Sequence, residues 1–560
     1  MQDRPSGAEQ DAQDAQDAQD DSVRNLADLL GVASRGRPDA PALLHPGYPS
    51  PLDGAEQTTW GGLDLLVDRA VVAFDALGLA PGDRVVLMLA NTLAFPVAYF
   101  GALRAGLVVV PLDVTAAPPE VQQQLDDSGA RAVVVSASAA ATVLQVSPLT
   151  AVETVLVTGL DSAPAGAQSF DALLTDPDAG TPGSSNPVST GEPSGSARAA
   201  GEDLAVLAYT SGTSGRPKGA MLSHRALLAD LDNVNRISPP VAGPDDVVLL
   251  VLPLTHIYGL NTGLGLVARV GATGLILERF DPSGTLAAVA EHAVTVVLGA
   301  PPVFVAWSLR GDVAESFTSV RLAISGAAPM PEAAARRLLE ATGRPIFEAY
   351  GLTETAPSVA STLMSEVPRG GSIGRPLPGV EVRLVDAAGV EVDEDDPGEI
   401  CVRGANLFSG YWPDRREGPD ADGWWPTGDV AVRDATGALT LVDRRRDLIL
   451  VSGFNVYPRE VEQALLTHPD VLEAAVLGIP HPYSGEAVRA LVVPRPGASL
   501  SVDELLEHVG RLLARFKCPT SIDVVDELPH SVTGKVSKGR LRESLREPAA
   551  GRELLRDPQG

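Results

Sequence analysis

A regular alternation of short apolar runs and helical patterns near the start of the chain constrains the fold most strongly. The expected elements are a strand at 84–90, a helix at 95–104, a strand at 107–112, a helix at 119–127 and a strand at 130–136. Consecutive parallel strands need a crossover connection, usually a helix, so this order predicts βαβ units and a largely parallel sheet. The predicted fold class is α/β, with a large N-terminal domain of βαβ-built sheets packed with helices.

The last quarter of the chain changes to a small α+β pattern. Pro458 can open a helix, Ser501 and Glu504 form a capping box before a second helix, and 471–479 and 488–493 have strand patterns. The predicted division is an acidic disordered tail at 1–21, a large domain at 22–443 with a Ser/Gly/Pro-rich excursion at 162–202, a small domain at 444–545 and a tail at 546–560.

Charge and cysteine content narrow the possible functions. A formal net charge of −29 over 560 residues argues against nucleic acid and anionic membranes as partners. Cys401 and Cys518, the only cysteines, form no C-x-x-C pair, which favours a reducing cytoplasm over a disulfide framework or a zinc site. We expect no signal peptide, because the N-terminus is polar and acidic, and no transmembrane segment, because no apolar run reaches the ~18 residues that a span needs.

The segment Tyr209–Gly219, which reads YTSGTSGRPKG, is the strongest candidate for a phosphate-binding loop. It follows the apolar run 204–209, and Ser223 can cap a helix soon after it. Backbone N–H groups and hydroxyls between a strand and a helix can surround phosphate oxygens, and Lys218 adds a positive charge. The nucleotide P-loop pattern does not fit here. From composition alone, a flexible linker is the alternative.

A second candidate segment is Val251–Gly259, which follows a strand pattern at 247–252 and contains His256. Loops after the strands of open α/β sheets often carry functional groups. The alternative for an isolated histidine is a hydrogen-bonded side chain at an internal interface.

YTSGTSGRPKG resembles the phosphate-loop signature of the adenylate-forming (AMP-binding) superfamily, and more closely its acyl-CoA synthetase branch. The other signatures of that family follow in family order and cover most of the chain. They are VLPLTHIYG at 251–259, SGAAPM at 325–330, EAYGLTET at 348–355, WWPTGD at 424–429, DRRRD at 443–447 with VSGFNVYP at 451–458, and LPHSVTGK at 528–535. Arg446 departs from the family, where lysine or aspartate is common at the hinge.

The resemblance implies a role for each matching position. Lys535, Thr353, Glu354 and His256 would be catalytic, with His256 beside the substrate carboxylate and Glu354 and Thr213 holding Mg²⁺. The nucleotide and CoA contacts would come from Thr210, Ser211, Gly212, Thr213, Ser214, Gly215, Lys218, Gly326, Ala327, Ala328, Ala349, Tyr350, Asp429, Arg444 and Gly453. The small C-terminal domain would be mobile and would bring Lys535 into the site during adenylation.

The implied activity is that of an ATP-dependent acyl-CoA synthetase, with ATP, Mg²⁺ and coenzyme A. The acid would form an acyl adenylate and then a thioester. Adenylation domains for amino acids place an aspartate in the histidine motif, and its absence here favours an acid without an amino group, most plausibly a medium- or long-chain fatty acid. Three alternatives stay open: a ligase that loads a separate carrier protein, an aryl or dicarboxylic acid–CoA ligase, and a regulator with an inactive site. The sequence leaves the oligomeric state undetermined.

Overall fold

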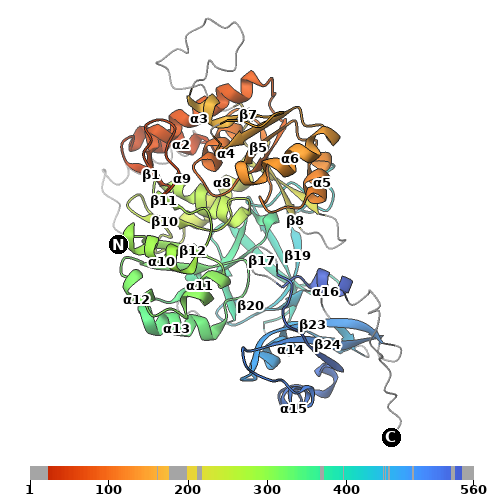
Figure 1. Ribbon diagram of the computed structural model, residues 1–560. Coiled ribbons are helices and arrows are strands. Elements are labelled where there is room, and N and C mark those ends of the chain that lie inside the picture. Colours follow the sequence, from red (N-terminus) through yellow and green to blue (C-terminus); the bar gives the residue numbers. More distant parts are fainter. Residues whose placement is uncertain are drawn as a thin grey trace, which may run out of the picture. The chain divides into compact units, whose positions relative to one another are not determined.

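A computed structural model describes residues 23–160, 162–175, 198–210, 217–365, 371–394, 396–444, 447, 449–451, 454–481, 485–530 and 536–544. Within these ranges the chain falls into two compact units (Figure 1). The larger unit contains the described residues up to 382 together with 401–425. The smaller unit contains 383–400 and the described residues from 426 onward.

The first sheet of the larger unit has seven strands, and it contains the predicted alternation of strands and helices. Its strand order is β7 (Gln168–Ser169), β6 (Thr154–Thr158), β5 (Ala132–Ser136), β3 (Arg84–Met88), β4 (Val108–Pro111), β8 (Leu204–Thr210) and β9 (Lys218–Ser223). All neighbouring strands are parallel except β8 and β9. The helices of this region are α3 (Trp60–Ala76), α4 (Ala94–Arg104), α5 (Pro118–Ser128), α6 (Ala140–Val146) and α7 (Phe170–Thr175).

Both faces of this sheet are buried, as expected for parallel strands covered by helices. Val86, Val133 and Val135 form one core with residues of α5 and α6. The alternate residues Val85 and Leu87 are also fully buried, on the opposite face.

The second sheet of the larger unit contains six parallel strands in the order β14 (Ile346–Gly351), β13 (Leu322–Ser325), β12 (Val296–Gly299), β10 (Val247–Leu250), β11 (Thr273–Ile276) and β1 (Pro41–Leu44). Antiparallel strands flank them, namely β2 (Gln57–Thr59) on one side and β15 (Ser358–Ser361) and β16 (Ser372–Pro376) on the other. The strands β17 (Val380–Val385) and β18 (Gly398–Gly404) follow in the chain, and each has residues in both units.

Helices cover this second sheet, and Figure 1 shows the helices α10 to α13 gathered beside it. These four are α10 (Pro282–Glu291), α11 (Pro301–Trp307), α12 (Val313–Ser316) and α13 (Glu332–Thr342), and their core is centred on the fully buried Trp307. The unit also contains α2 (Asp28–Gly36), α8 (His224–Asn235), the π-helix η4 (Tyr258–Gly265) and α9 (Leu266–Val270).

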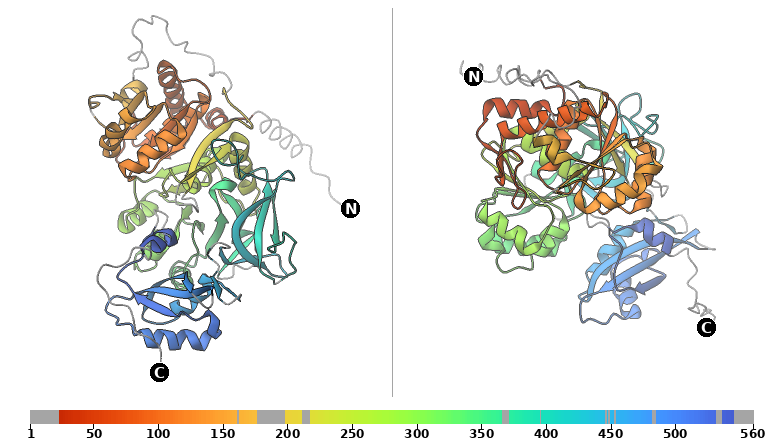
Figure 2. Two further views of the ribbon diagram at one scale, coloured as in Figure 1. Left: turned by 90° about the vertical axis from the view of Figure 1, so that its right-hand side faces the viewer. Right: turned by 45° about the horizontal axis from the view of Figure 1, so that its top comes forward.

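The smaller unit contains a hairpin and a separate mixed sheet. The hairpin consists of β19 (Trp425–Arg433), whose first residue belongs to the larger unit, and β20 (Leu439–Arg444). The sheet has the order β22 (Phe454–Val456), β21 (Ile449–Val451), β24 (Gly485–Pro494) and β23 (Val471–His481), with β25 (Ser521–Val524) paired to β24. Two helices, α14 (Pro458–Leu466) and α15 (Val502–Leu512), share one core with it, and α16 (Lys538–Ser544) follows. Figure 2 gives two further views of these elements.

The α/β fold class predicted from the sequence is confirmed, and so are several local predictions. Pro458 opens α14, and Ser223 and Ser501 accept capping hydrogen bonds at the starts of α8 and α15. The strand β9, which was not predicted, separates the candidate phosphate loop from α8. Among the helices of the described residues, none is long and apolar enough to cross a membrane.

Candidate active site

Four parallel strands of the second sheet deliver the candidate side chains to one edge. The strands β10, β12, β13 and β14 are neighbours in register, with Gly299 beside Ser325 and Ser325 beside Glu348. Carboxyl ends of parallel strands meet at the same sheet edge, where α/β proteins bind ligands. The segments of His256, Gly326 and Tyr350 therefore converge there.

The candidate phosphate loop joins β8 to β9, and its two ends are held by strand pairing. Thr210 lies opposite Lys218, and Tyr209 lies opposite Gly219. A Cβ atom on Gly219 would stand 2.7 Å from Cδ1 of Leu207, so a larger residue at this position would have to displace the leucine side chain. The loop residues Ser211, Gly212, Thr213, Ser214 and Gly215 lie outside the described residues.

Lys218 is held by residues that follow it by almost two hundred positions in the chain. Its Nζ pairs with Oε2 of Glu417 at 2.5 Å and lies 5.0 Å from the centre of the Tyr411 ring. The Lys218 side chain is 30% exposed and that of Glu417 is 65% exposed. An exposed pair of this kind is weak, so a phosphate group can displace the carboxylate.

The segment after β13 presents backbone rather than side chains. A Cβ atom on Gly326 would lie 2.7 Å from Cε1 of Tyr258, and the Gly326 N–H donates to the carbonyl of Gly299 at 3.0 Å. Ala327 has φ 70° and Ala328 is half-buried. The chain thus turns through a left-handed residue directly after the strand end.

Tyr350 and Glu354 stand on either side of a tight turn at the end of β14. Tyr350 is buried, and its neighbour Ala349 is half-buried within the strand. Thr353 and Glu354 form a 3₁₀ turn, η5 (Thr353–Thr355), in which Thr353 is half-buried and Glu354 is 7% exposed.

Buried polar side chains hold the backbone immediately after Glu354. Asn406 Nδ2 donates to the carbonyls of Thr355 and Ser358 at 2.8 and 2.9 Å. Asp230 accepts from the Ser358 N–H at 2.8 Å, and Asn261 donates to the carbonyl of Ala356 at 2.8 Å. The turn that carries Glu354 is thus fixed from both sides.

His256 is held as a neutral imidazole by its surroundings. Burial lowers its pKa to about 4, and its Nδ1 accepts from the Tyr258 N–H at 3.2 Å. The proton of the neutral ring is therefore on Nε2, which can donate a hydrogen bond. The loop before it is held by Asn91, which donates to the carbonyl of Leu252 at 2.8 Å and accepts from the Leu254 N–H at 2.9 Å.

In the smaller unit, Asp429 and Arg444 are paired in register across the β19–β20 hairpin. Asp429 is 6% exposed, and its N–H donates to the Thr427 hydroxyl at 3.1 Å. These two residues, predicted as a ribose-binding pair, are thus neighbours although fifteen positions separate them. Gly453 and Lys535 lie outside the described residues.

Sequence reasoning missed Tyr411, Glu417, Asn91, Asp230, Asn261 and Asn406. Each is a single polar residue whose partner is far away in the chain, and no spacing rule marks it. The available sequence signal was the aromatic pair Tyr411-Trp412 directly after Gly410. In the structure this glycine has a positive φ.

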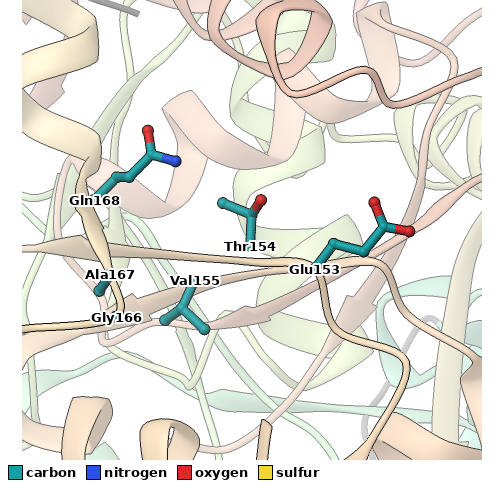
Figure 3. A pocket seen from close by; sticks show the side chains of 6 residues that line it. All are labelled: Glu153, Thr154, Val155, Gly166, Ala167 and Gln168. Carbon is teal, nitrogen blue, oxygen red and sulfur yellow. The ribbon is translucent and has the colours of Figure 1, made fainter. Parts of the chain in front are cut away.

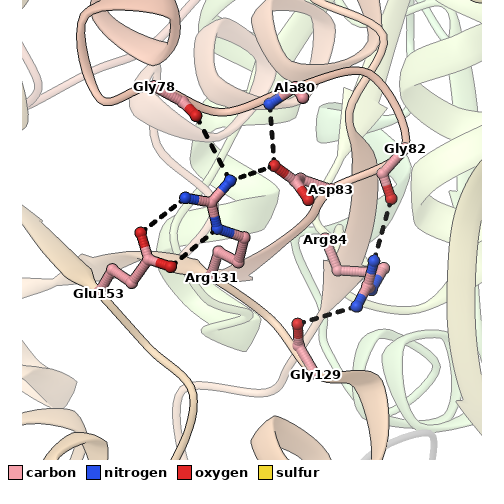
Figure 4. A network of polar contacts seen from close by, with 8 residues as sticks. All are labelled: Gly78, Ala80, Gly82, Asp83, Arg84, Gly129, Arg131 and Glu153. Carbon is pink, nitrogen blue, oxygen red and sulfur yellow. Dashed lines mark hydrogen bonds and ion pairs between the residues drawn. The ribbon is translucent and has the colours of Figure 1, made fainter.

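A shallow hollow of about 180 Å³ between β6 and β7 carries no reactive group (Figure 3). Its one ionisable side chain, Glu153, accepts from Arg131 through both oxygens, at 2.9 and 2.7 Å (Figure 4). The hydrogen bonds from Arg131 lower the pKa of Glu153, and Arg131 also reaches Asp83 at 2.5 Å. This network ties together the amino ends of β3, β5 and β6.

The chain belongs to the AMP-binding enzymes. The family model described as AMP-binding enzyme matches residues 32–412, and the one described as AMP-binding enzyme C-terminal domain matches residues 460–535. The family predicted from the sequence is thereby confirmed.

Within this family the chain is similar to acid–CoA ligases. It is 36% identical to a long-chain-fatty-acid–CoA ligase of Escherichia coli O157:H7, over 95% of this chain and 96% of the relative. It is 35% identical to a feruloyl-CoA synthase of Amycolatopsis sp, over 91% and 96%. The crystal structure of ATP-bound MatB from Rhodopseudomonas palustris superposes with a TM-score of 0.82 at 30% identity, covering 93% of this chain and 99% of that one.

Proposed function

We propose that this chain is an ATP-dependent acid–CoA ligase that activates a medium- or long-chain fatty acid. The observation that carries the proposal is the convergence of the His256, Gly326 and Tyr350 segments at one sheet edge, with Glu354 on the turn that follows. The similarity to long-chain-fatty-acid–CoA ligases over nearly the whole chain supports the choice of substrate.

The chemistry that the site would perform is the replacement of a poor leaving group by a good one. A carboxylate oxygen attacks the α-phosphorus of ATP. The bond from this phosphorus to the α,β-bridging oxygen breaks, and pyrophosphate leaves with that oxygen. The CoA thiolate then attacks the carbonyl carbon of the acyl adenylate, and AMP leaves. The protein contributes positioning and electrostatic stabilisation rather than a covalent intermediate.

In the first step, neutral hydrogen-bond donors and nearby cations would bind two anionic substrates, the carboxylate and ATP. The Nε2–H of His256 would donate to the carboxylate, and Lys218 would take phosphate oxygens once Glu417 is displaced. A local donor set is needed because the net charge of −29 repels both substrates at long range.

The donor set fits a magnesium ion. No group of three or more His, Cys, Asp or Glu side chains could hold a metal among the residues that the structure covers, and Glu354 is a single buried carboxylate. Mg²⁺ in nucleotide sites is commonly held by one or two carboxylates together with substrate phosphates. When bound, it would offset charge on the phosphates; Glu354, with Thr213 as the family resemblance implies, would hold it.

For four further residues the proposed roles come from the family resemblance. Asp429 and Arg444 would bind the ribose hydroxyls, Lys535 would stabilise the adenylation transition state, and Gly453 would line the pantetheine channel. A rotation of the small domain between the two steps would exchange Lys535 for the Gly453 face. We further propose a cytoplasmic location, because Cys401 and Cys518 form no disulfide.

The test is pyrophosphate release from ATP with acids of graded chain length, followed by thioester formation with CoA. The expected result is the fastest release with long-chain fatty acids, and no release with any acid would overturn the proposal. Lys535→Ala should abolish adenylate formation yet largely retain thioester formation from supplied acyl adenylate. Equal loss of both half-reactions would contradict the two-step scheme.

An aryl acid is the second candidate substrate, because the feruloyl-CoA synthase similarity extends over 91% of this chain. Ferulate in the same series decides between the two classes. Replacing CoA by a carrier protein that bears phosphopantetheine tests whether the acyl group is transferred to such a protein instead of CoA.

A further inference from the structure

The side chain of Tyr411 contacts both charged groups that the proposed function uses in the larger unit. Its hydroxyl donates to Oε1 of Glu354 at 2.6 Å, and its ring centre lies 5.0 Å from Nζ of Lys218. We infer that Tyr411 is a positioning residue that orients the Glu354 carboxylate for a divalent cation. This inference rests on the proposed function, because it presupposes that Glu354 meets a metal–nucleotide complex.

The backbone around Tyr411 is fixed to the strand that carries Lys218. Residues 409–412 run antiparallel to β9. The Trp412 N–H donates to the carbonyl of Gly219 at 2.8 Å, and the Met221 N–H donates to that of Gly410 at 3.1 Å. Tyr411 therefore extends the phosphate-binding hairpin by one short strand, and its Cα position is set by the same ladder as that of Lys218.

The ring of Tyr411 is held by an aromatic cluster. Phe408 is 1% exposed and packs edge-on against Tyr411 and Trp425, with ring centres 5.0 and 5.2 Å away. The Phe408 N–H also donates to the backbone carbonyl of Glu354 at 2.9 Å. Both the tyrosine and the glutamate are thus anchored to one buried phenylalanine, and their relative position is fixed before any ligand arrives.

The hydroxyl acts on the glutamate as an orienting donor. An O–H···O⁻ bond of 2.6 Å has the length of a charge-assisted hydrogen bond. It fixes the rotation of the carboxylate and leaves Oε2 for a cation. Because the donor is neutral, the hydrogen bond brings no positive charge that would repel a cation. Partners of this kind typically change metal affinity by about 10- to 100-fold when they are removed.

Tyr411→Phe isolates this role, because it removes the hydroxyl and keeps the ring on Phe408 and Lys218. The measurement is Mn²⁺ binding to the full chain with α,β-methylene-ATP, followed through free Mn²⁺ by electron paramagnetic resonance. We expect about tenfold weaker Mn²⁺ binding, with the affinity for the metal-free nucleotide analogue within about twofold of wild type.

Two further variants make the result specific. Tyr48→Phe is the matched control, since the Tyr48 hydroxyl also donates to a glutamate, Glu278, and it should bind Mn²⁺ as wild type does. In a Glu354→Gln background, Tyr411→Phe should weaken Mn²⁺ binding no further, because the two residues act as one unit.

Mn²⁺ affinity of Tyr411→Phe within twofold of wild type overturns the inference, as does an equal loss of metal-free nucleotide affinity. In both cases a wild-type chain that binds Mn²⁺ with nucleotide and releases pyrophosphate leaves the proposed function standing. A wild-type chain that binds no metal–nucleotide complex overturns both.

Discussion

Asp230 and Asn261, both fully buried, are joined by a 3.1 Å hydrogen bond from Nδ2 of the asparagine to Oδ2 of the aspartate. They come from α8 and η4, and together they hold the turn that follows Glu354. A carboxyl group so enclosed must either stay protonated or carry its charge without solvent, which makes this pair a sensitive point of the fold.

The first prediction concerns the pH dependence of stability. Burial raises the pKa of Asp230 well above its usual value of 3.8. Between the unfolded and the folded pKa the native state binds more protons than the unfolded state, so the free energy of unfolding falls as pH rises through this window. Asp230→Asn cannot ionise and should lose that fall. Urea unfolding at a series of pH values checks this.

The control for this experiment is Asp245→Asn, because the Asp245 side chain is 93% exposed. Its stability profile should run parallel to that of wild type. A parallel profile for Asp230→Asn as well would show that the buried carboxyl does not titrate differently in the folded state.

The second prediction concerns the charge of His256 during substrate binding. Its pKa of about 4 keeps the ring neutral from pH 5 to 8, so the KM for the acid should show no inflection near 6.5. His256→Ala should raise that KM by about tenfold, since a hydrogen bond to a charged group is lost. Pyrophosphate release across this pH range measures both effects.

His224 provides the comparison, because burial lowers its pKa to about 4 as well and its Nδ1 accepts from the Leu26 N–H at 3.2 Å. His224→Ala should lower stability and leave the KM for the acid unchanged. Since the folded pKa lies below the unfolded one, wild type should lose stability as pH falls from 6.5 towards 4. An inflection in KM near 6.5 would contradict a neutral His256.

The third prediction concerns competition for Lys218. Glu417→Gln removes the carboxylate that pairs with Nζ at 2.5 Å, and the KM for MgATP should fall about two- to threefold, in line with an exposed ion pair. Glu381→Gln, which breaks the exposed pair with Arg403, serves as the control and should leave KM unchanged. A higher KM in Glu417→Gln would mean that the glutamate assists nucleotide binding instead.

The fourth prediction concerns the turn between Tyr350 and Glu354. A Cβ atom on Gly351 would stand 1.8 Å from the carbonyl oxygen of Pro357, so Gly351→Ala must displace backbone and should destabilise the protein by several kcal/mol. Gly510→Ala is its counterpart: nothing lies within 4 Å of the added methyl group in α15, and about 0.5–1 kcal/mol of stability should be gained. Thermal unfolding distinguishes the two, and equal melting temperatures would contradict the predicted clash.

The fold was predictable where apolar runs and turn residues agree. The run at 84–90 and the helical pattern at 95–104 correspond to β3 and α4, because nearly every residue of both elements is buried and apolar. The strand β9 was missed, since Lys218 and Gly219 at its start are poor strand formers. Its existence depends on pairing with β8, which is a tertiary effect.

The residues of the candidate site also fall into a group that could be predicted from the sequence and a group that could not. Glu354 and Tyr350 were predicted because they stand in a contiguous signature, and the structure places them around one turn. Tyr411, Asn91 and Asn406 could not be predicted, because their partners are 57, 161–163 and 48–51 positions away in the chain. Such contacts depend on how the sheets fold together, and a single sequence contains no record of that pairing.

The pairing of Asp429 with Arg444 gives the short connection between β19 and β20 an importance that its composition hides. The Asp434 carboxylate accepts the N–H groups of Thr436 and Ala438 and so sets the length of that connection. Adding or deleting one amino acid there would shift the register of the hairpin, so that Asp429 and Arg444 would no longer lie opposite each other. Grafting this hairpin onto another ligase would therefore have to carry its bend along with its strands.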